Sequence, residues 1–240
     1  MSLSVEHLTK YYKDFCALDQ VSFSVSTGEV VGLLGPNGAG KTTIIHILLG
    51  LLKSTSGKVS VMGFDPIKDR LEMANVINFS SAYTSLPSNL KVSENMQVYA
   101  GLYGLQKPQN RIDDLLRLFE LYQFKDRLTG ALSSGEKTRL NICKSLLNNP
   151  SLLLLDEPTA SLDPVMARTV RDVIKQLQKE TQMTVLYTSH DMAEVEELCQ
   201  RVLFVNHGKM IEQGTPQEIM LRHQARDLDE VFIKITRSQS

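Results

Sequence analysis

The stretch from Gly35 to Thr43 constrains the fold of this chain more than any other part of the sequence. It reads Gly-Pro-Asn-Gly-Ala-Gly-Lys-Thr-Thr and matches the phosphate-loop pattern G-x-x-x-x-G-K-[ST] at every required position. The apolar run of Val30 to Leu34 before it is typical of a buried strand, and Ile44 to Leu52 after it has helical spacing. A strand, a glycine-rich loop and a helix therefore follow one another in the order that a nucleotide site requires.

The residue types in this loop suit the binding of phosphate groups. Its glycines allow a tight turn in which backbone N–H groups point inward at phosphate oxygens, and the helix that follows adds a partial positive charge. We expect Lys41 to reach the β and γ phosphates, Thr42 to bind Mg²⁺ through its hydroxyl, and Thr43 to bond a further phosphate oxygen. A glycine-rich turn that carries Lys-Thr by chance is the alternative, and a matching acidic strand downstream counts against it. The predicted phosphate-binding residues are Gly35, Pro36, Asn37, Gly38, Ala39, Gly40, Lys41, Thr42 and Thr43.

Length and charge narrow the class of protein further. With 240 residues the chain can bury a sizeable core, and its formal net charge of −1 gives no global basic field for nucleic acid or an acidic membrane. Cys16, Cys143 and Cys199 form no Cys-x-x-Cys pair, which is typical of buried thiols in a reducing cytosol. Met1 to Tyr12 has no signal-peptide pattern and Ile44 to Leu52 is too short to span a membrane, so we expect a soluble chain.

Two segments near the N-terminus predict an antiparallel sheet. Leu3 to Leu8 and Val21 to Val25 alternate apolar and polar residues, as half-buried strands do. Lys10 to Asp14 is predicted to form a loop between them. The tyrosines of such a loop, Tyr12 among them, either pack on the sheet edge or offer an aromatic plate for a nucleobase, and the residues alone leave both interpretations open.

The remainder of the chain alternates strand and helix patterns. Strands are expected at Lys58 to Met62, Val76 to Phe79, Ser151 to Leu155, Thr184 to Thr188, Val202 to Val205 and Met210 to Gln213. Helices are expected at Val92 to Tyr103, Arg111 to Tyr122, Ser134 to Asn148, Asp163 to Thr181, Met192 to Cys199 and from Thr215 onward. This order predicts an α/β fold with a P-loop NTPase core, a mostly parallel sheet, an N-terminal antiparallel β region and an inserted α-helical subdomain. The predicted division is a nucleotide-binding core of residues 1–82 and 151–240 and a helical subdomain of residues 83–150.

An acidic pair follows directly on one of the apolar strands. A Mg²⁺ ion that bridges phosphates needs a nearby carboxylate, so this strand and the phosphate loop together predict a two-part ATPase site. We expect Asp156 to hold Mg²⁺ through water and Glu157 to orient and polarise the attacking water as a general base. A surface acid pair that caps a strand is the alternative. His190, at the end of the next strand, is expected to stabilise charge on the γ phosphate, with a structural histidine as its alternative.

Ser133 and Gly135 stand at the start of the helix expected from Ser134. A hydroxyl and a backbone N–H at a helix N-terminus can bind an anion. An ordinary serine N-cap has the same pattern, so the residues alone leave both interpretations open.

The ordered set of these motifs resembles the ATP-binding subunits of ATP-binding-cassette (ABC) transporters over essentially the whole chain. The matching motifs are Gly35 to Thr43 (Walker A), Leu132 to Glu136 (signature), Leu152 to Glu157 (Walker B), and Ser161 to Asp163 with His190 (D-loop and switch histidine). The resemblance implies a head-to-tail dimer with ATP between Walker A of one copy and the signature of the other. It implies that Ser133 and Gly135 touch the γ phosphate in trans and that Tyr12 stacks on adenine.

Three positions depart from the pattern of this family. The signature usually has Gly where Ser134 stands and often Gln where Glu136 stands, and we expect activity to survive both changes. Ala82 falls where the family has a glutamine that contacts Mg²⁺ and relays the nucleotide state to the membrane partner. Alanine cannot ligate a metal, and Ser80, Ser81 or water are the alternatives for this contact. The resemblance therefore leaves open how ATP hydrolysis is coupled to the membrane partner.

The resemblance implies an ATP-binding and ATP-hydrolysing motor subunit that uses ATP and Mg²⁺ and drives a separate membrane permease. The implied partners are a second ATP-binding subunit, identical or not, and membrane-embedded permease subunits, without nucleic acid, at the cytoplasmic face of the inner membrane. Leu228 to Phe232 and Tyr99 to Gly104 are similar to the exporter branch for drugs and polysaccharides, with an amphipathic terminal helix and a helix end as the alternative interpretation. The alternative function is a soluble ABC ATPase or a nucleotide-dependent regulatory module without transport.

Overall fold

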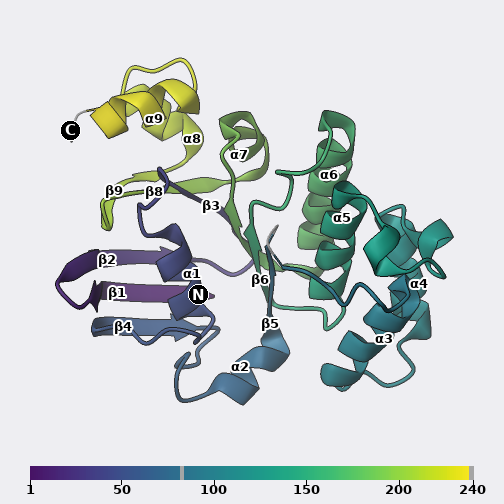
Figure 1. The fold of residues 1–240 in the computed structure, drawn as a ribbon. Coiled ribbons are helices and arrows are strands. Elements are labelled where there is room, and N and C mark those ends of the chain that lie inside the picture. Colours follow the sequence, from purple (N-terminus) through teal and green to yellow (C-terminus); the bar gives the residue numbers. More distant parts are fainter. Residues whose placement is uncertain (82–83, 238–240) are drawn as a thin grey trace. The chain divides into compact units, whose positions relative to one another are not determined.

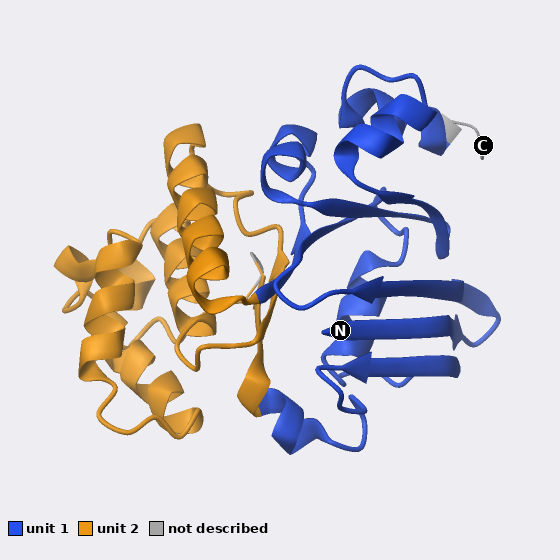
Figure 2. Ribbon diagram, turned by 180° about the vertical axis from the view of Figure 1, so that it is seen from behind, with its two compact units in different colours: residues 1–74, 184–240 blue, residues 75–183 orange. Residues whose placement is uncertain are grey.

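The computed structural model describes residues 1–81 and 84–237, which fall into two compact units. The first unit is Met1–Ala74 with Thr184–Ser240, and the second is Asn75–Met183 (Figure 2). The second unit is therefore one continuous insertion in the sequence of the first. The functional division proposed above, into residues 1–82 with 151–240 and residues 83–150, stays a prediction.

The first unit contains a three-stranded antiparallel sheet. Its strands are β1 (Leu3–Tyr12), β2 (Phe15–Val25) and β4 (Ser56–Val61), in the order β2-β1-β4 (Figure 1). Alternate residues of β1 and β2, such as Val21, Phe23 and Val25, are buried, and their neighbours are partly exposed. The N-terminal antiparallel β region predicted from alternation is confirmed.

The predicted loop from Lys10 to Asp14 is wrong over most of its length. β1 continues to Tyr12, which pairs with Phe15, so the turn is only two residues long. Its first residue, Lys13, has a φ of 53°, and positive φ angles allow so short a turn between antiparallel strands. The register of β1 also shifts on either side of Leu8, which interrupts the apolar and polar alternation that marks a strand in sequence.

Parallel strands form the rest of the first unit's β structure. β7 (Thr184–Thr188) and β8 (Arg201–Asn206) pair in parallel with β3 (Val30–Leu34), one on each side, and β9 (Lys209–Gly214) pairs antiparallel with β8. Every residue of β3 and β7 is buried. This explains why both sequences are nearly continuous apolar runs and do not alternate apolar with polar residues. The helices of this unit are α1 (Lys41–Leu48), α7 (Met192–Leu198), α8 (Pro216–Arg222) and α9 (Leu228–Arg237). The predicted α/β fold class is confirmed.

The second unit joins a parallel strand pair to helices. β5 (Ile77–Ser81) pairs with β6 (Leu152–Asp156), whose first four residues are buried. The helices are α3 (Val92–Leu102), α4 (Gln109–Leu118), α5 (Ser134–Ser145) and α6 (Pro164–Thr181), with short 3₁₀ turns at Tyr122–Phe124 and Thr129–Ala131. α4 ends before the predicted Tyr122. α2 (Arg70–Val76), which was not predicted, crosses the sequence boundary between the units and buries only Met73.

Candidate nucleotide-binding site

The predicted phosphate loop joins the end of β3 to the start of α1. Gly35 and Gly40 have φ angles of 154° and 109°, in the region that favours glycine. A Cβ on Gly35 would overlap the carbonyl oxygen of Val205, and a Cβ on Gly40 would lie 2.7 Å from Cδ2 of Leu18. Only glycine allows the loop to pass this close to its neighbours and still begin α1, whose first N–H groups have no partner within the helix.

Lys41 is the first residue of α1, and its amine turns back over the loop. Its Nζ donates to the carbonyl oxygens of Gly35 at 2.5 Å and of Pro36 at 3.1 Å. These bonds keep a positive charge beside the loop backbone. Thr42, which is exposed, and Thr43, which is half-buried, add hydroxyl groups in the same helical turn. A glycine cradle, an ammonium group and two hydroxyls fit a bound polyphosphate with its cation.

His190 is exposed and lies two residues after β7. Because β3 and β7 are parallel neighbours, with Gly32 opposite Tyr187, His190 and the phosphate loop follow strands at the same edge of the sheet. The buried carboxylate of Glu194 accepts hydrogen bonds from the hydroxyls of Tyr187 at 3.0 Å and Ser189 at 3.2 Å. These bonds fix the backbone that carries His190. Sequence reasoning missed this support, because no pattern shows that Glu194 turns inward.

The turn between β8 and β9 supports the phosphate loop from another side. The N–H of Gly208 donates to the carbonyl oxygen of Ala39 at 3.0 Å, and its own carbonyl accepts from the N–H of Asp19 at 2.8 Å. Gly208 has a φ of 73°, and a Cβ there would lie 2.6 Å from the carbonyl oxygen of Ala17. The sequence predicts the strands on either side of this turn, Val202 to Val205 and Met210 to Gln213, but not the contact of the turn with the phosphate loop.

Tyr12 lies at the end of β1, with 46% of the residue exposed. The Nζ of Lys10 lies 5.1 Å from the centroid of its ring, and Phe15, its partner across the strands, is 66% exposed. A ring that merely packed on the sheet would be more fully covered. The exposure therefore favours the aromatic plate over the packing interpretation, and the stacking on adenine stays a prediction.

The acidic pair stands where the sequence predicts it, at the carboxyl end of β6. Asp156 is the last residue of this strand, and Ser81, the last residue of β5, lies opposite it. The hydroxyl of Ser81 donates to Oδ2 of Asp156 at 3.5 Å, a long and weak bond. Glu157 follows with a φ of 53°, a left-handed conformation that costs a residue with a Cβ about 1 kcal/mol.

The predicted N-cap at the start of α5 is confirmed. The hydroxyl of Ser133 accepts from the N–H of Glu136 at 3.2 Å, and the carboxylate of Glu136 accepts from the N–H of Ser133 at 2.7 Å. This reciprocal capping box accounts for the glutamate at this position. A Cβ on Gly135 would lie 3.3 Å from the side chain of Leu162. The contact of Ser133 and Gly135 with a γ phosphate stays a prediction.

The predicted site residues are divided between the two units. The first unit carries Tyr12, the loop from Gly35 to Thr43 and His190, and the second carries Ser133, Gly135, Asp156 and Glu157. Ala82, aligned with the glutamine of the family, lies outside the described residues. Within the described part of the chain, no helix is both long enough and apolar enough to cross a bilayer.

Comparison with known proteins identifies the class that these features define. A family model described as "ABC transporter" matches residues 18–160. The ABC transporter ATP-binding protein NatA of Bacillus subtilis (strain 168) is 35% identical over 220 residues, which cover 90% of this chain and 89% of NatA. The solved structure of an ATP-binding subunit of an ABC transporter covers 98% of this chain and is itself covered fully, with a TM-score of 0.88 and 27% identity. A dimeric ATP-binding cassette, solved in a post-hydrolysis state with ADP and Pi, gives a TM-score of 0.80 at 25% identity, with coverage of 89% and 98%.

The chain therefore belongs to the ATP-binding subunits of ABC transporters. It binds ATP, hydrolyses it, and is the motor subunit for a membrane transporter. The soluble ATPase and the regulatory module without transport are not favoured.

Proposed function

We propose that the working unit is a head-to-tail pair of ATP-binding subunits that encloses ATP between them. The phosphate loop of one copy, from Gly35 to Thr43, binds the phosphates, and Ser133 and Gly135 of the other copy meet the γ phosphate. Two observations support this: the glycine cradle with the held amine of Lys41, and a capped helix start that presents Ser133 at the surface. The dimeric cassette among the similar structures is consistent with it.

Each side chain of the site has a proposed task. Lys41 neutralises charge on the β and γ phosphates, and Tyr12 stacks on the base. The hydroxyl of Thr42 and the carboxylate of Asp156 hold Mg²⁺, which supplies further charge neutralisation when it is bound. Oxygen ligands are the ones that this cation prefers.

Glu157 and His190 serve the hydrolytic step. The carboxylate of Glu157 accepts a hydrogen bond from the attacking water and polarises it, and His190 stabilises the charge that develops on the γ phosphate. The transfer is direct to water, with no covalent intermediate, because phosphoryl transfer needs mainly positioning and charge stabilisation.

Closing and opening of this pair do mechanical work on a separately encoded permease. The subunit then resides at the cytoplasmic face of the inner membrane through that permease, and transport runs outward. Outward transport is supported by the similarity of Tyr99 to Gly104 and of Leu228 to Phe232 to the exporter branch. Copurification of a membrane protein with the full chain tests the partner, and its absence would overturn this part of the proposal.

The observation that carries the catalytic proposal is the position of the acidic pair, Asp156 and Glu157, at the carboxyl end of β6. The test is phosphate release by the purified chain and by Glu157→Gln. We expect turnover to fall by at least roughly 100-fold, the usual contribution of a general base. Glu180→Gln is the matched control, since Glu180 is exposed on α6 and its oxygen accepts from Gln176, a bond that glutamine can keep. Equal rates for the wild type and Glu157→Gln would remove the general-base assignment.

A further inference from the structure

Helix α5 carries a line of polar side chains beyond its first turn. Thr138, Asn141 and Lys144 are spaced by three along one side of the helix, and we call them the α5 stripe. Their exposed fractions are 6%, 4% and 7%, although these residue types are mostly found at the surface. Burial of polar groups is costly unless they are hydrogen-bonded, so each member of the stripe needs a partner.

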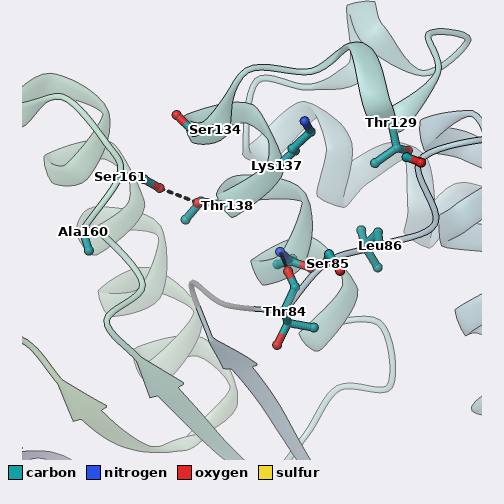
Figure 3. A pocket seen from close by; sticks show the side chains of 11 residues that line it. Thr84, Ser85, Leu86, Thr129, Ser134, Lys137, Thr138, Ala160 and Ser161 are labelled. Carbon is teal, nitrogen blue, oxygen red and sulfur yellow. Dashed lines mark hydrogen bonds between the residues drawn. The ribbon is translucent and has the colours of Figure 1, made fainter.

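Each member of the α5 stripe binds a different segment of the second unit. The hydroxyls of Thr138 and Ser161 are hydrogen-bonded at 2.6 Å (Figure 3). The Nδ2 of Asn141 donates to the carbonyl oxygen of Thr84 at 2.7 Å, and the Nζ of Lys144 donates to that of Phe79 at 3.1 Å. One helix therefore fastens the segment after β6 and the main chain on both sides of residues 80–83.

These partners lie next to the residues of the proposed site. Ser161 belongs to the D-loop motif that follows Glu157, and Phe79 stands two residues before Ser81, whose hydroxyl donates to Asp156. The same helix begins at the capping box of Ser133 and Glu136, within the signature motif, and we call this first turn the signature turn. Thr84, Thr138, Asn141 and Ser161 also line a cavity of about 490 Å³ in this unit.

Two members of the stripe also carry a cost in stability. The Oδ1 of Asn141 is buried and accepts no hydrogen bond from the residues that the structure describes, so the acceptor side of this amide is unmatched within the protein. Lys144 forms no ion pair with a described carboxylate, and its Nζ lies 5.5 Å from the centroid of the Tyr99 ring. Burial lowers the pKa of Lys144 to about 8. Apolar side chains of similar size would avoid both costs.

We propose that Asn141 and Lys144 are positioning residues for ATP hydrolysis: they hold the main chain on both sides of residues 80–83 in fixed register with the signature turn. Ala82 stands in that segment where the family has a glutamine, and a bond to a main-chain carbonyl does not depend on the side chain at that position. The α5 stripe thus links the signature helix to Phe79 and Thr84, the residues that flank this segment, without the glutamine. This inference rests on the proposed function of the signature turn.

Hydrogen exchange on the full chain tests the positions directly. In Asn141→Ala we expect amide exchange in residues 84–90 to quicken by roughly fivefold, which corresponds to the free energy of one lost hydrogen bond. The melting temperature is expected to stay within a few degrees of the wild type. The kcat for ATP is expected to fall by roughly tenfold with KM within about twofold, because position rather than binding is lost. Ser145→Ala is the matched control, since the buried hydroxyl of Ser145 bonds within α5 to Ile142 and its loss leaves this exchange unchanged.

Lys144 provides a second test that does not depend on the folding of the first variant. Lys144→Met is expected to quicken exchange in residues 77–81, and Lys144→Arg, which keeps a donor, to restore it toward the wild type. If exchange is unchanged in both Asn141→Ala and Lys144→Met while the wild type hydrolyses ATP, this inference is overturned and the proposed function stands. Absence of ATPase activity in the wild type would overturn the proposed function, and the exchange measurement would still decide whether the stripe holds these segments.

Discussion

At the scale of single residues, several side chains and glycines of this protein hold the backbone of the candidate site in place. The clearest case is the pair of contacts that Gly208 makes with Ala39 and Asp19, because it ties the turn between β8 and β9 to the phosphate loop. The amine of Lys41 ties the same loop from within through Gly35 and Pro36. The proposed phosphate-binding loop is therefore held in shape by contacts within the protein itself, and such preorganisation lowers the cost of binding a ligand.

Gly208→Ala is expected to disturb this loop. The new Cβ would lie 2.6 Å from the carbonyl oxygen of Ala17 in a backbone with a φ of 73°, so we expect a loss of roughly 2 kcal/mol in the free energy of unfolding and a raised KM for ATP. Denaturant unfolding and steady-state ATPase assays measure both. Gly104→Ala is the matched control, since Gly104 has a φ of 68° but open space around it. Equal effects of the two substitutions would show that the conformation alone matters and the contact does not.

Lys144 gives a pH dependence of stability. Burial lowers its pKa to about 8 in the folded chain from the ordinary value of 10.5, so between these values the unfolded chain binds the proton that the folded chain has released. Stability from this group therefore rises with pH across that window and is lowest below pH 8. We expect the difference in unfolding free energy, wild type minus Lys144→Met, to grow by roughly 1–2 kcal/mol from pH 7.5 to pH 9.5. A difference that stays flat or falls would contradict the burial of a titrating amine.

At the scale of elements, α5 combines tasks that sequence patterns report separately. Its first turn is a capping box of Ser133 and Glu136, and its buried side binds Phe79, Thr84 and Ser161. Since packed interiors are stiff, we expect a displacement at the start of α5 to reach the segments that the helix holds.

The two roles of Ser133 can be separated by substitution. Asparagine caps a helix as well as serine does, so Ser133→Asn is expected to keep the unfolding free energy within about 0.5 kcal/mol, whereas Ser133→Ala is expected to lose about 1 kcal/mol. Both variants are expected to lose most ATPase activity, since neither offers a hydroxyl to the γ phosphate of the other copy. Full ATPase activity of Ser133→Asn would show that Ser133 serves only as the N-cap of α5 and has no role in hydrolysis. Phosphate release and thermal melting distinguish the outcomes.

Local signals in the sequence predict many of these elements. The proline after Asp163 and the apolar runs at Thr184 to Thr188 and before Asp156 place α6, β7 and β6 close to their observed bounds, because caps and buried strands depend on adjacent residues. The extension of β1 to Tyr12 was missed because left-handed Lys13 allows a turn of only two residues where the sequence predicted a longer loop. α2 was missed because it buries one side chain and so has little apolar periodicity.

The candidate site was predictable to a smaller degree. The phosphate loop, the acidic pair and the N-cap at Ser133 each follow from a short stretch with a strand or helix beside it. Supporting contacts were not predictable: the inward turn of Glu194 toward Tyr187 and the bond from Asn141 to Thr84 join segments that only the tertiary fold brings together. In sequence these side chains look like ordinary polar positions on helices.

At the scale of the whole molecule, the proposed site is complete only when two copies meet. The loop from Gly35 to Thr43 supplies phosphate-binding groups of one copy, and Ser133 and Gly135 supply the groups that close over the ATP of the other. A two-fold arrangement of this kind is isologous: each copy is both donor and acceptor, and the two-fold rotation closes the pair. Activity then depends on protein concentration, because dissociation removes half of every site.

The most direct test of this central claim is the ATPase activity per molecule of the purified chain as a function of its concentration, with the association state followed by sedimentation in the same buffer with ATP. We predict that specific activity rises with concentration in step with the fraction of dimer and is largely lost where the chain is monomeric. A specific activity that stays constant into the monomeric range would contradict the composite site.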